Sequence, residues 1–201
     1  GAFGEFFCSA HILHKMKRAL KITGVVTGLF LIPLLAAFMY YLGVTANVRL
    51  DTNKLVTPSA YVRLYDASGE EIPAAVAATC AADSLPDCVG NAFVAVEDKR
   101  FYEHHGIDTK RIFGALWHNL TSFSFKEGAS TISQQLIKNT HLSSEKTINR
   151  KLKEMKLARA LEKKYSKEEI LSMYLNSIYF GHSAFGIENA AQYYFGIHAS
   201  Q

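Results

Sequence analysis

The hydrophobic and polar positions divide the chain into one unbroken apolar run and a longer part with helical periodicity. Residues 22–48 carry no charged side chain. A helix rises about 1.5 Å per residue, so about 20 apolar residues cross a hydrocarbon core about 30 Å thick. The run exceeds the apolar region of a cleavable signal peptide, and Pro33 is tolerated inside a membrane helix. We predict a transmembrane signal-anchor helix over residues 22–48; a buried core helix is the alternative.

The charged residues that flank this run set its orientation. Basic side chains precede it and a mixed set follows it: Lys15, Lys17, Arg18 and Lys21 before, Arg49, Asp51 and Lys54 after. Under the positive-inside rule, residues 1–21 form a cytoplasmic N-terminal segment and residues 49–201 form a domain on the outer face of a cell membrane. Cys80 and Cys88 then face an oxidising compartment, where a disulfide and two free thiols are equally open.

The remainder of the chain is predicted to be mainly α-helical, with one small β-hairpin. Residues 60–65 alternate between apolar and polar side chains, and turn-forming residues follow within 66–72, so strand, turn and strand are expected inside residues 56–75. Beyond the hairpin, apolar residues recur at helical spacing almost to the end. Residues 121–128 have turn chemistry and predict a loop. Three aromatic side chains in or near this loop either contact the membrane or pack within the protein: Trp117, Phe123 and Phe125.

Composition and charge narrow the function classes. The hydrophobic fraction of 49% excludes a disordered chain, and three Cys exclude a disulfide scaffold. The formal net charge is +4, yet residues 136–170 alone hold ten Lys or Arg against five Asp or Glu. This concentration favours a polyanionic partner; a solvated, salt-bridged helix face is the alternative. No Walker-type glycine-lysine signature is present, which argues against a nucleotide.

The first chemical cluster surrounds Glu97. If residues 91–104 are helical, then Phe93, Glu97, Phe101 and His104 share one face. Glu97 would then lie between two aromatic rings, where desolvation disfavours the charged carboxylate and suits a general base. A surface acid near a helix end is the alternative.

The second cluster is a capped helix start within residues 128–139. Thr131 with a Gln three positions later is typical of an N-terminal cap. The unpaired N–H groups of such a terminus attract anions. Thr131, Gln135 and Lys138 recur on one face, which suits a phosphate. An ordinary capped surface helix is the alternative.

The third cluster lies on a predicted helix over residues 149–162. A helical projection directs Glu154 toward the side of Ala158 and Leu161, with Arg150 and Lys151 beside it. A carboxylate and two cations directed at a partly apolar region suggest a lined cleft. The alternative is an exposed Arg150–Glu154 pair that contributes a few tenths of a kcal/mol.

Five ordered motifs carry a resemblance to a known family. They are E-D-x-x-F-x-x-H-x-G at residues 97–106, G-x-S-T-I-(S/T)-Q-Q-L-x-K-N at 128–139, R-K-x-x-E-x-x-x-A-x-x-L-E at 150–162, Y-L-N at 174–176 and G-I-x-x-A-A-x-x-Y-F-G at 186–196. The chain resembles the family 51 glycosyltransferases, the peptidoglycan polymerase domains of class A penicillin-binding proteins and monofunctional transglycosylases. The resemblance implies a lysozyme-like, mainly α domain behind an N-terminal membrane anchor.

The resemblance also implies an activity and a site. The family polymerises lipid II into β-1,4 glycan strands with inversion and releases undecaprenyl diphosphate. Glu97 is then the general base, and Glu154 is the second catalytic glutamate. Ten substrate-binding residues are expected: Asp98, Phe101, His104, Ser130, Thr131, Gln135, Lys138, Asn139, Arg150 and Lys151. Among them, Phe101 and His104 are expected to shape the site around Glu97 rather than to transfer protons.

Cofactors and partners follow from the same resemblance. A divalent cation, Mg²⁺ or Mn²⁺, shared with the substrate diphosphate is expected, and no organic cofactor. The expected partners are lipid II, lipid-linked glycan, the bacterial cell membrane and other cell-wall synthesis proteins, with no nucleic acid.

Two departures from the family pattern and two other functions remain open. Ser172 stands where the family has Glu, which would loosen a supporting contact. The family domain continues past its last motif, so the domain is expected to be incomplete after Gln201, and a monofunctional polymerase and one with a transpeptidase domain are both open. A glycan-cleaving hydrolase is a second enzyme hypothesis, although it has no need of diphosphate-binding cations. A membrane-anchored module that binds a lipid diphosphate or a partner is the non-enzymatic hypothesis.

Overall fold

The computed structural model describes most of the chain, in two units. The described residues are 2–56, 64–65, 67–68, 71–72, 85–122, 130–143 and 145–201. Internal contacts divide the chain into residues 1–46 and residues 47–201.

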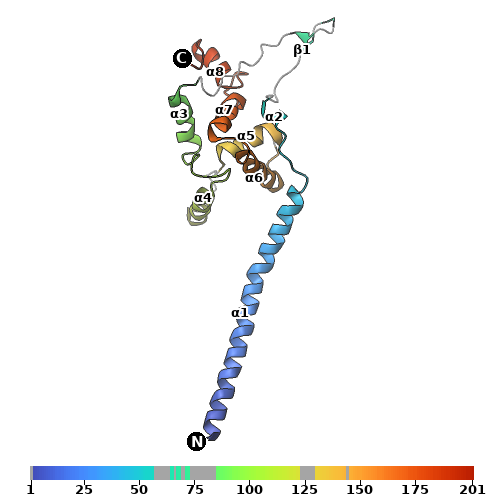
Figure 1. Cartoon of the computed structure of the whole chain (residues 1–201), viewed down its shortest axis with the longest axis vertical. Coiled ribbons are helices and arrows are strands. Elements are labelled where there is room, and N and C mark those ends of the chain that lie inside the picture. Colours follow the sequence, from blue (N-terminus) through green and yellow to red (C-terminus); the bar gives the residue numbers. More distant parts are fainter. Residues whose placement is uncertain are drawn as a thin grey trace. The chain divides into compact units, whose positions relative to one another are not determined.

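The first unit is one long helix, α1 (Ala2–Thr45; Figure 1). Its segment Thr23–Thr45 is long and apolar enough to cross a membrane, and many of its large apolar side chains are exposed. Pro33 lies inside the helix without ending it. The predicted span over 22–48 therefore runs past the end of α1 into a turn. The orientation of the span stays a prediction.

The second unit is mainly helical, as predicted. Its helices are α2 (Asn53–Val56), α3 (Asp87–Glu97), α4 (Thr109–Ser122), α5 (Ile132–His141), α6 (Ile148–Glu162), α7 (Lys167–Ser177) and α8 (Ile187–Phe195). The hairpin is confirmed at β1 (Leu64–Tyr65) and β2 (Glu71–Ile72), which pair antiparallel with Leu64 opposite Ile72. The rest of the predicted hairpin lies largely outside the described residues.

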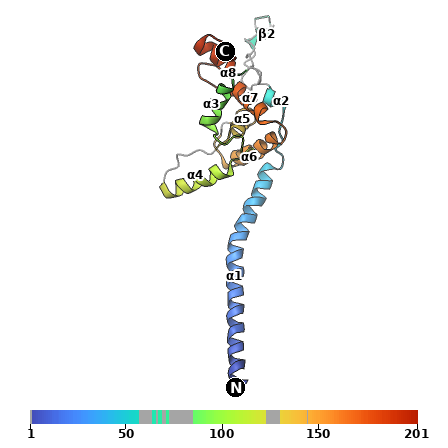
Figure 2. The ribbon, with the colours of Figure 1, turned by 60° about the vertical axis from the view of Figure 1, so that its left-hand side comes forward.

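Helix α5 is at the centre of the second unit. It packs against both α6 and α7, and the three helices lie together in both views (Figures 1 and 2). The side chains of Leu136 and Ile137 on α5 are fully buried, as are Leu161 on α6 and Ile170 on α7. Burial of each side chain of this size contributes about 1.5–3 kcal/mol to the free energy of unfolding. The polar residues of α5 are therefore held at fixed positions by its packing.

Local capping explains where these three helices begin. Thr131 and Gln134 form a reciprocal capping box at the start of α5, and Ser166 and Glu169 form another at α7. The Thr147 hydroxyl accepts a hydrogen bond from the Arg150 N–H at α6. Each bond satisfies an N–H group that has no partner within its helix. The predicted cap at Thr131 is confirmed.

The predicted helix over residues 91–104 is wrong beyond Glu97. Helix α3 ends there because Asp98 leaves the helical conformation (φ −153°, ψ 72°). The Phe101 N–H then donates to the Asp98 carbonyl and forms a turn. Glu97, Phe101 and His104 therefore do not line one helical face. Phe101 is fully buried and His104 is buried, whereas Glu97 is half-buried.

Helix α4 extends away from the α5–α7 core in Figure 2. Its last turn overlaps the start of the loop expected over residues 121–128. Thr121 and Ser122, predicted as loop, form its last residues. Trp117 is 71% exposed, so ordinary packing within the described residues does not account for this side chain. Phe123 and Phe125 lie outside the described residues. So does Cys80, while Cys88 is exposed on α3.

Candidate active site

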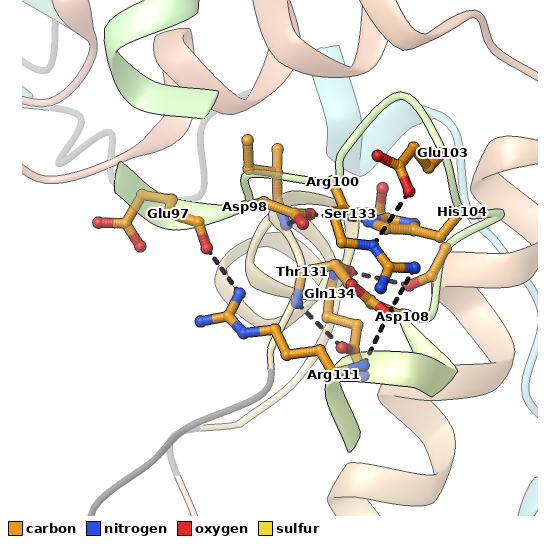
Figure 3. Close-up of polar contacts among 12 residues, drawn as sticks. Glu97, Asp98, Arg100, Glu103, His104, Asp108, Arg111, Thr131, Ser133 and Gln134 are labelled. Carbon is orange, nitrogen blue, oxygen red and sulfur yellow. Dashed lines mark hydrogen bonds and ion pairs between the residues drawn. The ribbon is translucent and has the colours of Figure 1, made fainter. Parts of the chain in front are cut away.

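Glu97 is held at the end of α3 by contacts from two other helices. The Gln135 amide nitrogen, on α5, donates to Glu97 Oε2 over 2.9 Å. The Tyr174 hydroxyl, on α7, donates to Gln135 Oε1 over 3.2 Å. From α4, Arg111 Nη1 donates to the main-chain carbonyl of Glu97 over 2.9 Å, and Figure 3 shows the Glu97 carboxylate directed away from that guanidinium. The backbone and the carboxylate of Glu97 therefore have separate supports.

Asp98 ties the end of α3 to the start of α5. Its Oδ2 accepts a hydrogen bond from the Ile132 N–H (3.0 Å) and lies 2.9 Å from His104 Nε2. Asp98 is 1% exposed. A carboxylate on a helix N-terminus is stabilised by the N–H groups and the helix dipole. Asp98 therefore fixes the residue next to it, Glu97, relative to α5.

The N-terminus of α5 is consequently occupied by the protein itself. The Thr131 N–H donates to Gln134 Oε1, the Gln134 N–H donates to Thr131 Oγ1, and the Ile132 N–H is bound to Asp98. Internal acceptors thus take three of the N–H groups at this terminus, and binding of a phosphate here stays a prediction. The Thr131 hydroxyl also donates to the Gly106 carbonyl (2.8 Å), inside the protein.

Four expected substrate-binding residues have buried side chains: Asp98, Phe101, His104 and Thr131. Asp98 also lines a cavity beside Glu97. His104 lies between two carboxylates, 2.9 Å from Asp98 and 3.8 Å from Glu162. This burial limits direct contact with a substrate and suits the shaping role expected for Phe101 and His104. The substrate-binding roles of the four residues stay predictions.

Glu154 lies between two cations, and this prediction is confirmed. Glu154 is 2% exposed, and its Oε2 lies 3.0 Å from Arg150 Nη1. Lys151 Nζ contacts Glu154 Oε1 and also donates to the Ser130 hydroxyl over 2.8 Å. The Arg150 Nε–H donates to the Glu145 carbonyl. The cations are thus oriented by a carboxylate that burial keeps away from bulk water.

The two glutamates are connected through a single segment. Gln135 contacts Glu97, and Ser130, directly before the N-cap of α5, contacts Lys151. Gly106 keeps the turn that follows Glu97 close to α6: its φ is +84°, and an added Cβ would lie 2.7 Å from the Ala158 carbonyl. Ends of α3, α5 and α6 are therefore brought together, although more than fifty residues separate Glu97 from Glu154.

Lys138 and Asn139 lie farther along α5, and both are exposed. Lys138 is in the last turn of the helix. Its exposure suits an anionic ligand at the protein surface, and its role in diphosphate binding stays a prediction.

A cavity of about 570 Å³ lies beside Glu97 and contains cations that the sequence pattern did not single out. It is lined by Val96, Glu97, Asp98, Lys99, Arg100, Asp108, Lys110, Arg111 and Ala115. Arg100 pairs with Glu103 (3.2 Å) and Asp108 (3.3 Å) in Figure 3. The sequence signal for these cations was a pair of basic dipeptides, Lys99-Arg100 and Lys110-Arg111, on either side of the Gly106 turn. They were missed because residues 136–170 carry a larger excess of positive charge.

Glu154, the acid beside the cations expected to bind the diphosphate, already pairs with two cations of the protein. Both carboxylate oxygens of Glu154 contact cations, one from Arg150 and one from Lys151. Among the described residues, no three His, Cys, Asp or Glu side chains form a metal-binding group. Mg²⁺ and Mn²⁺ require oxygen ligands, so an ion at Glu154 would have to displace a cation. The described residues therefore do not fit a metal ion held by the protein alone, and the cation expected to be shared with the substrate diphosphate stays a prediction.

A family model described as Transglycosylase matches residues 70–201. The chain therefore belongs to the transglycosylase family, and its mainly helical domain is the lysozyme-like transglycosylase domain.

Relatives of this chain include both long and short proteins. It is 50% identical to "Penicillin-binding protein 1A/1B" of Bacillus subtilis (strain 168), over 74% of this chain and 16% of that protein. It is 44% identical to "Penicillin-binding protein 1A" of Clostridium tetani (strain Massachusetts / E88), over 73% and 20%. It is 41% identical to "Monofunctional glycosyltransferase" of Staphylococcus haemolyticus (strain JCSC1435), over 83% and 54%. The chain thus spans between about a sixth and about half of these relatives.

Proposed function

We propose that the protein is a peptidoglycan glycosyltransferase that polymerises lipid II into β-1,4 glycan strands for cell-wall synthesis. Family membership and the names of the relatives support this activity. One observation carries the proposal: the start of α5 and the residue before it contact both glutamate sites, although the two glutamates have different surroundings. Gln135 binds the carboxylate of Glu97, and Ser130 binds the Lys151 that pairs with Glu154.

Glu97 is the general base in this proposal. Its carboxylate takes the proton from the 4-hydroxyl of the acceptor sugar as the oxygen attacks the anomeric carbon of the donor. The bond from that carbon to the diphosphate oxygen breaks, and the configuration inverts. Within the described part of the chain, the polar contact of the carboxylate is the neutral Gln135 amide. A carboxylate that no cation holds is free to accept a proton, and such catalysis contributes typically 10²–10⁴-fold.

The cations of α6 and α5 stabilise the departing diphosphate. Negative charge grows on the leaving oxygen, and fixed positive groups lower the energy of that state. Arg150 and Lys151 are held by the buried Glu154, so they need little reorganisation when the charge appears. The exposed Lys138 adds a further positive charge. Glu154 acts here by orienting cations, without transferring a proton.

The membrane anchor belongs to the same proposal. The lipid of the substrate stays in the bilayer, so an enzyme attached to that bilayer has no need to extract it. We infer that α1 crosses the membrane once through Thr23–Thr45, with its N-terminus in the cytoplasm and the catalytic domain on the outer face. Lipid II and lipid-linked glycan are the proposed substrates, and other cell-wall synthesis proteins are proposed partners.

The experiment is to give the full-length protein purified lipid II and to separate the products by length. The proposal predicts glycan polymer together with released undecaprenyl diphosphate. Cleavage of preformed glycan without polymer would instead indicate the hydrolase. Binding of lipid II without turnover by the intact protein would indicate the binding module.

A further inference from the structure

Three side chains from three helices form a continuous hydrogen-bonded row that ends on Glu97. The Tyr174 hydroxyl donates to Gln135 Oε1 over 3.2 Å, and Gln135 Nε2 donates to Glu97 Oε2 over 2.9 Å. Tyr174 is 3% exposed, Gln135 is half-buried, and Glu97 lines the cavity. The row therefore runs from the core of the domain to the reacting carboxylate.

The middle member of this row can point in two ways. A carboxamide has an accepting oxygen at one corner and a donating nitrogen at the other, and rotation by 180° exchanges them. With the nitrogen toward Glu97, the amide donates to a carboxylate, which is a charge-assisted hydrogen bond. With the oxygen toward Glu97, two electron-rich oxygens would face each other. The orientation of Gln135 therefore decides whether the carboxylate is supported or repelled.

The phenol of Tyr174 stabilises the supporting orientation. The ionised Glu97 carboxylate only accepts hydrogen bonds, so the amide nitrogen faces it, and the Tyr174 hydroxyl donates to the amide oxygen that is left on the other side. Burial and the nearby Glu97 carboxylate raise the pKa of Tyr174 to about 12. The hydroxyl consequently keeps its proton over the whole working pH range and remains available as a donor.

The position of that hydroxyl is set by the core. Helix α7 packs against α5, and the neighbours of Tyr174 and Gln135 in sequence, Leu175 and Leu136, are almost completely buried. The Tyr174 carbonyl accepts hydrogen bonds from the Ile178 N–H and from the Ser177 hydroxyl (3.0 Å). Few rotamers are open to a ring enclosed in this way, so the donor is available at a fixed place.

We propose that Tyr174 is a positioning residue for the reaction: through Gln135, it holds a hydrogen-bond donor against the carboxylate of Glu97 and so keeps that carboxylate directed at the acceptor hydroxyl. This inference rests on the proposed function, since it assumes that Glu97 is the general base. It changes the expected role of Gln135 from substrate binding to support of Glu97. It also gives the Tyr of the Y-L-N motif a part in the chemistry, although that ring does not touch the substrate.

The test is Tyr174→Phe in the full-length protein, with kcat and KM for lipid II measured across pH. The ring is retained, so the loss is confined to the donor. We expect kcat to fall about 3–10-fold and KM to change less than twofold, because binding groups are untouched. The acidic limb of the kcat/KM profile should move upward by about 0.5–1 pH unit, because the ionised carboxylate has lost a fixed donor. A merely structural role for the hydroxyl would leave this limb in place.

A double-mutant cycle tests whether Tyr174 acts through Gln135. Gln135→Met removes the middle of the row while it retains the length of the side chain. Tyr174→Phe should then have less than a twofold further effect, because residues that act as a unit are not additive. Tyr194→Phe is the matched control. It also removes a hydroxyl that donates to a protein oxygen, the Phe180 carbonyl (2.9 Å), away from Glu97, and its pH profile should match the wild type.

The outcomes separate this inference from the proposed function. Wild-type polymerisation with an unshifted limb in Tyr174→Phe, or with multiplicative effects in the cycle, would overturn the role of Tyr174 and leave the function intact. No polymer from the wild type would overturn the function itself. If Tyr174→Phe melts far below the wild type, the pH limb of Gln135→Met decides in its place: an upward shift supports the row, and an unchanged limb rejects it.

Discussion

The two glutamates of the site have opposite surroundings. Glu154 is almost fully buried, and each of its carboxylate oxygens contacts a cation, Arg150 or Lys151. Glu97 is half-buried, and its described polar contact is the neutral amide of Gln135. Both oxygens of Glu154 are thus engaged in ion pairs, whereas the Glu97 carboxylate has an uncharged hydrogen-bond partner and suits proton transfer from a substrate.

This difference teaches how one helix organises two kinds of chemistry. The side chain of Gln135 holds the residue that moves a proton, and Ser130 before the cap of α5 contacts the lysine that supplies fixed charge. The buried Asp98 carboxylate accepts a hydrogen bond from the first N–H group of α5 and so fixes the end of α3 against this helix. Neutralising each glutamate in turn should therefore produce different losses.

The largest loss is expected for Glu97→Gln. The amide has the shape of the acid but does not accept the proton, so polymerisation should fall about 10²–10⁴-fold. The melting temperature should change by less than about 2 °C, because the carboxylate is half-exposed and no described cation depends on it. Glycan synthesis and thermal melting of the full-length protein measure both quantities.

Glu103→Gln is the matched control for this variant. Glu103 pairs with Arg100, which lines the cavity, but the Glu103 side chain is 61% exposed. Exposed pairs of this kind contribute about 0–1 kcal/mol, and the control should polymerise lipid II like the wild type. Equal losses in the two variants would contradict the assignment of Glu97.

A smaller catalytic loss with a loss of stability is expected for Glu154→Gln. Arg150 and Lys151 would lose the anion that orients them, and polymerisation should fall about 10–100-fold, which corresponds to about 1.5–3 kcal/mol for hydrogen bonds to a charged group. The free energy of unfolding should decrease by about 1–3 kcal/mol. Denaturant unfolding of the full-length protein checks this value. Glu168→Gln, an exposed acid on α7, should leave both quantities unchanged.

A further reduction is expected for Arg111→Met. This change removes the hydrogen bond to the Glu97 carbonyl, so the end of α3 should be less well fixed while the Gln135 contact remains. We expect kcat to fall about 3–10-fold, because small displacements of a reacting group are costly. Arg111→Lys retains a donor and should recover part of the rate. Steady-state kinetics with lipid II decide, and an unaltered kcat in Arg111→Met would show that this support is dispensable.

The smallest effect concerns stability at mild acid. Burial lowers the pKa of His141, whose Nε2 lies 2.9 Å from the Asp51 carbonyl. The unfolded chain therefore binds a proton more readily near its usual pKa of about 6.5, and the folded state loses stability as the pH falls below that value. His141→Gln should lose less stability than the wild type between pH 7.5 and pH 5.5 in urea unfolding. Parallel losses in the two proteins would contradict this role.

Features set by nearby residues were predictable from the sequence. The capping box at Thr131 involves residues three positions apart, and Arg150, Lys151 and Glu154 lie within one helical turn. The apolar run of α1 and the helical periodicity of the domain belong to the same group. Each depends on contacts that helical spacing alone defines.

Features set by distant residues were not predictable. Helix α3 ends at Glu97 because the Asp98 carboxylate binds the N–H of Ile132, far along the chain. Nothing in the pattern of residues 91–104 indicates that partner. For the same reason, the contact of Asp98 with the N-terminus of α5 was missed, and so was the contact of Arg111 with Glu97.

Binding of undecaprenyl diphosphate to two variants of the full-length protein tests the division of roles most directly. The account predicts that Glu97→Gln binds this lipid within about twofold of the wild type while it makes no polymer. Glu154→Gln should bind it at least about tenfold more weakly, which corresponds to about 1.4 kcal/mol. Weakened binding in Glu97→Gln together with unchanged binding in Glu154→Gln would contradict the account.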